Sequence, residues 1–92
     1  MAVLSDAEVE GRLKSLAGWA REGAEIRGEF KFKDFAEAMI FVNRVAEEAE
    51  EADHHPDITI NYNRVHLALS THSEGGLTAK DFDLAAKINA VA

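Results

Sequence analysis

The chain has 92 residues, of which 47% are hydrophobic, so a single domain spanning residues 1–92 is expected. Its formal net charge of −7 argues against direct binding to nucleic acid or to an anionic membrane. The absence of cysteine excludes disulfides, thiolate chemistry and zinc–thiolate sites. The sequence shows no signal-peptide pattern and no apolar run near the roughly 20 residues that span a bilayer, which favours a cytoplasmic protein.

A helix is expected near the N-terminus. Ser5 and Glu8 have the spacing of a capping box, in which each side chain binds the other residue's backbone N–H. An apolar stripe at helical spacing continues to Leu16, and Gly18 is expected to end the helix.

Two strands and a second helix should follow. Apolar and charged side chains alternate along residues 26–32, which predicts a pair of half-buried strands turning near Gly23. Asp34 and Glu37 form another capping pair, so a long helix is expected to run to about Ala52.

This long helix carries more apolar surface than packing on one sheet requires. One face holds seven apolar residues: Phe35, Ala38, Met39, Val42, Val45, Ala46 and Ala49. Phe41 and Ala52 widen the arc beyond about 100°, and Ile40 lies outside it. The pattern is either a broad core stripe with a stray surface residue or a helix that also packs against a second subunit. The small size of the domain favours the second reading, with Phe41 and Ile40 at the interface.

All four histidines lie between Asp53 and His72. "DITINY" and "VHLALSTH" read as two alternating strands, and a two-residue loop at Asn63-Arg64 would join them. That register places His55 opposite His72 on the polar face of the hairpin. Directly opposed residues have Cβ atoms roughly 5 Å apart, so both imidazoles would reach one small molecule.

After a turn at "SEGGL", Thr78 and Asp81 are expected to cap a last helix that runs to about Val91. The complete order is then αββαββα, with strands in adjacent pairs. This order favours an α+β fold, in which a four-stranded antiparallel sheet carries three helices on one face.

The histidines suit proton transfer, because the unperturbed pKa of this side chain lies near neutral pH. Asp53 could orient one of the rings of His54 and His55 through a carboxylate–imidazole hydrogen bond. Two other interpretations stay open. The histidines could form only a polar surface, or Asp53, His54, His55 and His72 could bind zinc or iron. His66 lies some 20 Å along the strand from His72 and is interpreted as a sheet residue.

The segment from Asp53 to Ile88 closely resembles the signature region of the pterin-4a-carbinolamine dehydratases. The matching parts are the Asp-His-His-Pro block at residues 53–56, the Thr71-His72 pair, and Gly76-Leu77-Thr78 leading to Asp81. The tryptophan, the aromatic strand and the long helix of the N-terminal half also fall where that family has its own, so the resemblance covers nearly the whole chain.

The resemblance implies removal of water from 4a-hydroxytetrahydropterin, giving quinonoid dihydropterin, the step that recycles the cofactor of aromatic amino acid hydroxylases. It implies no metal and no organic cofactor. It assigns His54, His55, His72 and Asp81 to catalysis. Pterin contacts would come from Asp53, Pro56, Thr71, Ser73 and Glu74. The alternative is a non-catalytic oligomerisation or pterin-binding module on the same fold.

The resemblance also implies how subunits assemble. Members of the family pair by extending the sheet, and the pairs join through their long helices into a tetramer that is a dimer of dimers. A homotetramer is therefore expected, with residues 34–52 at one interface.

Overall fold

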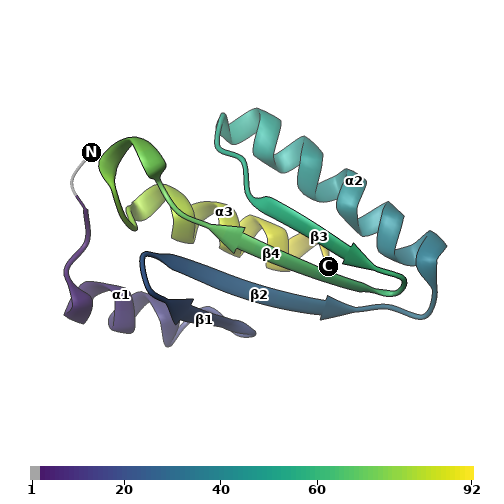
Figure 1. The fold of residues 1–92 in the computed structure, drawn as a ribbon, viewed down its shortest axis with the longest axis horizontal. Coiled ribbons are helices and arrows are strands. Elements are labelled where there is room, and N and C mark those ends of the chain that lie inside the picture. Colours follow the sequence, from purple (N-terminus) through teal and green to yellow (C-terminus); the bar gives the residue numbers. More distant parts are fainter. Residues whose placement is uncertain (1–2) are drawn as a thin grey trace.

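A computed structural model describes residues 3–92 of the chain. The elements, in order, are α1 (Asp6–Leu13), β1 (Trp19–Glu22), β2 (Glu25–Lys31), α2 (Phe35–Ala52), β3 (Asp57–Asn61), β4 (Arg64–Leu69), the short 3₁₀ helix η1 (His72–Glu74) and α3 (Ala79–Val91). The strands form one antiparallel sheet in the order β1-β2-β4-β3, and the three α-helices lie on one face of it (Figure 1). The predicted α+β fold is confirmed.

The capping box of α1 is present. The Ser5 N–H donates to the Glu8 carboxylate at 3.0 Å, and the Glu8 N–H donates to the Ser5 hydroxyl at 3.2 Å. The first of these bonds holds the pKa of Glu8 below its usual value. The helix ends earlier than expected, however, at Leu13 rather than near Gly18. The hydroxyl and N–H of Ser15 both bind the carbonyl of Arg12, and this local bonding competes with continued helix.

The first two strands turn where the sequence predicts. Gly23 sits in the turn with φ of 62°, a conformation that glycine adopts without a Cβ clash. Gly28 pairs with Trp19 across the two strands, and a Cβ added at Gly28 would lie 2.8 Å from Cε2 of the indole. Gly28 therefore makes room for Trp19, whose Nε1 donates to Asn89 at 2.9 Å and ties β1 to α3.

The expectation that Phe41 lies at a subunit interface is wrong. Phe41 is 2% exposed, and its ring centroid lies 4.7 Å from that of Phe30 and 4.9 Å from that of Phe32. The arc of α2 that carries Phe41 faces the sheet, so the extra width of the apolar stripe serves the core of the single chain. Ile40 lies outside that arc as predicted and is 52% exposed.

The register of the β3–β4 hairpin differs from the prediction. Ile58 pairs with Leu67, Ile60 with Val65, and the two-residue loop is Tyr62-Asn63 instead of Asn63-Arg64. Each partner shifts by two residues, which keeps every side chain on its predicted face.

Two features locate the turn. Tyr62 takes the left-handed conformation with φ of 52° that was expected of an asparagine. Asn63 is held from outside the hairpin, because its side-chain amide donates to the carbonyl of Phe32 at 2.9 Å and its own carbonyl accepts from the Phe32 N–H at 2.8 Å. The same register, extended past Asp57, sets His55 opposite Ser70, so the predicted pairing of His55 with His72 is also wrong.

Among the helices of residues 3–92, none combines the length and the apolar character that a membrane crossing requires.

Candidate functional site

Three segments meet at one end of the sheet, where the chain enters β3, leaves β4 and begins α3 (Figure 1). The first segment carries His54 and His55, the second carries His72, and the third carries Asp81. Antiparallel pairing of β3 with β4 brings the first two segments together, and the Thr71–Gly76 bridge folds the chain back toward α3. The candidate residues of the sequence thus gather at one end of the molecule.

Asp53 ends α2, and the two histidines that follow it contact different carboxylates. It caps α2 in the left-handed conformation, with φ of 50°, and its N–H reaches the carbonyls of Ala49 and Glu50. The His54 N–H also donates to the carbonyl of Ala49, at 3.1 Å. Aspartate tolerates this conformation better than most residues, which accounts for its place here. The carboxylates that meet the rings of His54 and His55 are those of Asp81 and Glu50, and not that of Asp53, as the sequence had suggested.

His54 and Asp81 form a buried pair. The His54 Nε2 lies 2.6 Å from Oδ1 of Asp81, and the two side chains are 12% and 0% exposed. Oδ2 of the same carboxylate accepts from the Thr71 hydroxyl and from the Thr78 N–H, each at 2.9 Å. The Thr78 hydroxyl lies 2.8 Å from that of Thr71, so both hydroxyls are satisfied inside the protein. A carboxylate in the first turn of α3 is also favoured by the helix dipole.

This arrangement fixes the orientation of the His54 ring. Because the Asp81 carboxylate accepts, the His54 Nε2 donates to it, and the Nδ1 of the neutral ring is left as an acceptor. A carboxylate that orients an imidazole in this way is a recurrent device of acid–base catalysis. The buried Thr71 hydroxyl is turned toward Asp81, which makes Thr71 a support of the pair as well as an expected pterin contact.

The ring of His55 contacts a solvent-exposed carboxylate. Its Nε2 lies 2.5 Å from Oε2 of Glu50 in the last turn of α2, and the two side chains are 57% and 77% exposed. Pro56 follows and favours an extended backbone at His55.

His72 begins the 3₁₀ helix η1, and Ser73 and Glu74 complete that helix on the surface. The His72 Nε2 lies 3.4 Å from the hydroxyl of Ser70, the residue that the hairpin register sets opposite His55. His72 lines a hollow of about 360 Å³ together with Ser70, Gly75 and Gly76. His54 lines a different hollow, of about 180 Å³, with Lys80 and Lys87 of α3.

Sequence reasoning missed Glu50 and the hydroxyl of Thr78. Glu50 lies five residues before His55, and its approach depends on the reversal of the chain at Asp53, which no helical spacing reveals. Thr78 carried a signal in its capping spacing with Asp81, but the contact of its hydroxyl with Thr71 depends on the fold of the intervening loop.

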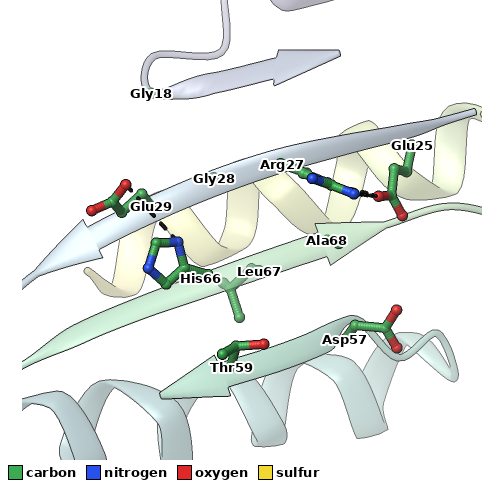
Figure 2. Close-up of a pocket in the computed structure, with 10 residues that line it drawn as sticks. All are labelled: Gly18, Glu25, Arg27, Gly28, Glu29, Asp57, Thr59, His66, Leu67 and Ala68. Carbon is green, nitrogen blue, oxygen red and sulfur yellow. Dashed lines mark hydrogen bonds and ion pairs between the residues drawn. The ribbon is translucent and has the colours of Figure 1, made fainter. Parts of the chain in front are cut away.

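The open face of the sheet carries a further hollow, of about 610 Å³, whose lining includes none of these three histidines (Figure 2). His66 lies there on β4, with its Nδ1 3.9 Å from the carboxylate of Glu29 on β2, which agrees with its interpretation as a sheet residue. Arg27 on the same face donates to Glu25, a hydrogen bond that raises the pKa of the guanidinium.

Within residues 3–92, no three His, Asp or Glu side chains are grouped closely enough to hold a metal ion. The ligand cluster that the zinc or iron reading requires is therefore not formed by the described histidines.

Known proteins resemble this chain over nearly its whole length. The family described as "Pterin 4 alpha carbinolamine dehydratase" matches residues 2–91. A protein of Acidobacterium capsulatum named "Putative pterin-4-alpha-carbinolamine dehydratase" is 57% identical over 91 residues, which are 99% of both chains. The crystal structure of a "transcriptional coactivator/pterin dehydratase" from Brucella melitensis superposes with a TM-score of 0.94 at 42% identity, covering 98% of both chains.

A more distant likeness concerns the fold alone. A "pterin dehydratase-like protein", described as a RuBisCO assembly factor in the alpha-carboxysome, has a TM-score of 0.66 at 23% identity. The alignment covers 80% of this chain and 86% of that one.

Proposed function

Because the chain belongs to the pterin 4 alpha carbinolamine dehydratase family, we propose that it converts 4a-hydroxytetrahydropterin to quinonoid dihydropterin and water. This reaction recycles the pterin cofactor of aromatic amino acid hydroxylases. The observation that carries the proposal is the gathering of His54, His55 and His72 at one end of the sheet, two of them already held by carboxylates.

The proposed reaction needs two proton transfers. One imidazolium gives a proton to the 4a-hydroxyl, so that the C–O bond breaks and the oxygen leaves as water. One neutral imidazole takes the proton from a ring nitrogen, whose electron pair forms the new double bond. Such positioned proton transfers typically contribute about 10²- to 10⁴-fold in rate. Asp53, Pro56, Thr71, Ser73 and Glu74 would contact the pterin, and Asp81 would hold the ring of His54.

The purified protein is expected to accelerate dehydration of 4a-hydroxytetrahydropterin without added metal and in the presence of a chelator. Replacing His55 or His72 with alanine should each lower the rate by about 10²-fold, because each removes a proton carrier. Stopped-flow absorbance of the quinonoid product measures the rate.

His66→Ala is the matched control, since His66 lies on the open face of the sheet and should keep full activity. Unchanged rates in both the His55 and the His72 variants would contradict the proposed chemistry. Pterin binding without turnover by the unmodified protein would favour the non-catalytic module instead.

The expected tetramer finds support in a second stripe on α2. Phe35, Met39, Val42 and Ala46 recur at intervals of four, three and four residues, the spacing of a coiled-coil seam. Phe35 is 50% exposed, Ala46 is exposed, and Met39 and Val42 are only half-buried within the chain. We propose that this stripe, and not Phe41, joins pairs of subunits into a dimer of dimers.

Replacing Met39 with glutamate is expected to reduce the mass in solution from that of a tetramer to that of a dimer, because it places a charge in the proposed seam. Light scattering at micromolar concentration measures the mass. Ile40→Glu is the comparison, since Ile40 projects from a different side of α2 and should leave the tetramer intact. A monomer mass for the unmodified protein would refute the assembly. A change in the Ile40 variant alone would move the interface to the other side of the helix.

A further inference from the structure

We propose that Val3 is a positioning residue for His72. Val3 and Leu4 form the segment directly before the cap of α1, and this segment acts as a strap on the loop of residues 71–76, which carries His72. Contact of the Val3 side chain with Gly76 keeps the loop, and with it the imidazole, in one place. The inference rests on the proposed function and adds to it a residue from the N-terminal segment.

The strap is bonded to the residue that follows this loop. The Leu4 N–H donates to the carbonyl of Leu77 at 2.8 Å, which sets the segment before α1 beside the chain between β4 and α3 (Figure 1). Leu77 is 2% exposed, so the bond ties the strap to a residue that is fixed in the core. This bond brings the neighbouring residue, Val3, against the loop.

Val3 lies where a side chain on Gly76 would be. A Cβ added at Gly76 would lie 2.9 Å from Cγ1 of Val3, which is closer than two carbon atoms can pack. Gly76 does not have a positive φ, so its backbone conformation is one that other residues also adopt. The missing side chain is therefore explained by the approach of Val3, which leaves Gly76 buried.

Gly76 connects the strap with the candidate site. Its carbonyl accepts from the Thr71 N–H at 3.0 Å, and this bridge closes the loop. Thr71 donates its hydroxyl to Asp81, and His72 is the next residue in the chain. His72 and Gly76 also line the same hollow of about 360 Å³. A shift of Gly76 would therefore move His72 together with the threonine that supports Asp81.

Helix α1 fixes the other end of the strap. The capping box of Ser5 and Glu8 begins directly after Leu4. Leu4 and Val9 occupy the two positions of a hydrophobic staple, one before the cap and one in the first turn, and both belong to the core. The staple sets the angle at which the chain enters the helix, and so directs Val3 toward the loop. The proposal thus gives α1 a part in positioning the site.

Val3→Ala tests the strap, with Val3→Thr as the matched control. Alanine removes both branches that reach Gly76, whereas threonine keeps the branched shape. The first readout is amide hydrogen exchange in the ligand-free protein. In Val3→Ala the N–H groups of Thr71 and Gly75 should exchange about tenfold faster, because the loop opens more often, while those of β4 keep their rates. In Val3→Thr all of these rates should stay unchanged.

The second readout is the steady-state rate of dehydration. Val3→Ala should lower kcat about tenfold and leave KM within about twofold, because His72 is present but less often in the reacting position. Val3→Thr should keep the kcat of the unmodified protein. A change in overall stability alone would not produce this division, since the β4 amides report it separately.

A second substitution exchanges the two halves of the contact. Gly76→Ala should push the Val3 side chain away from the loop and lower kcat as Val3→Ala does. In the double variant Val3→Ala/Gly76→Ala, the added Cβ would lie 3.9 Å from the Cβ of residue 3, an ordinary contact that refills the space. The double variant should therefore exceed both single variants in kcat and return to within about twofold of the unmodified protein.

Three results would overturn the proposal. They are exchange rates at Thr71 and Gly75 that do not change in Val3→Ala, a kcat of Val3→Ala equal to that of Val3→Thr, and a double variant slower than both single variants. If the unmodified protein shows no turnover, the proposed function fails, and the exchange rates alone decide whether the strap holds the loop.

Discussion

Replacing Asp81 with asparagine is expected to lower the rate of pterin dehydration by about 10²- to 10³-fold. Three donors converge on this carboxylate: the His54 Nε2, the Thr71 hydroxyl and the Thr78 N–H. An asparagine offers one oxygen and one NH₂ group in their place. If the oxygen keeps the two donors on the threonine side, the NH₂ faces His54 and forces its Nε2 to accept. The neutral ring then carries its proton on Nδ1 and loses the acceptor that the proposed proton transfer needs.

The same substitution should also cost about 1–3 kcal/mol of stability, because a neutral amide replaces the charged carboxylate that strengthens the buried hydrogen bonds from His54, Thr71 and Thr78. Initial rates and thermal unfolding followed by circular dichroism measure the two effects separately. Asp83→Asn, on the exposed side of the same helix turn, is the control and should change neither. A folded Asp81→Asn protein with a rate within twofold of the unmodified one would show that His54 does not depend on this carboxylate.

Replacing Phe41 with glutamate is expected to prevent folding of the single chain. The ring is 2% exposed and packs between Phe30 and Phe32, so the substitution removes a large buried side chain and puts a carboxylate in its place. Removing a buried phenylalanine alone typically costs about 3–5 kcal/mol, and burying an unpaired charge adds to this. The sum approaches the whole stability of a small domain, about 5–15 kcal/mol.

Circular dichroism and urea titration at 25 °C check this result. The neighbouring Ile40→Glu variant is the control, because Ile40 is 52% exposed and its replacement should leave the chain folded. A cooperative unfolding transition in Phe41→Glu with an unchanged midpoint would place Phe41 outside the core.

Local rules account for most of the architecture. The capping spacings at Ser5 and Asp34, the alternation along residues 26–32 and the punctuation at Gly23 each act over a few residues, so the sequence predicts those elements close to their true bounds. The same is true of the α+β order, because strands adjacent in the sequence pair readily with each other. The early end of α1 escaped prediction because the bonds of Ser15 to the Arg12 carbonyl leave no periodic signal.

Local rules did not predict the register of the β3–β4 hairpin. Asn63 suggested a loop that begins at residue 63. The loop begins at Tyr62 instead, and Tyr62 takes the left-handed conformation because hydrogen bonds hold Asn63 to Phe32, 31 residues away. That choice moved His55 from a place opposite His72 to one opposite Ser70. In the same way, the width of the apolar arc on α2 does not reveal which of its side chains face the sheet. The packing of Phe41 against Phe30 and Phe32 places the Phe41 side of the arc in the core.

By itself, the sequence determined which residues carry the candidate chemistry, because the Asp-His-His-Pro block, Thr71-His72 and Asp81 can be recognised from residue type and spacing alone. Only the tertiary structure decided their partners. His54 meets Asp81 across 27 residues, and His55 turns back to Glu50 because the chain reverses at Asp53. A hydrogen bond needs its two atoms within about 3 Å in a set direction. Periodicity and spacing locate a residue on an element, but that precision arises only when the elements pack against one another.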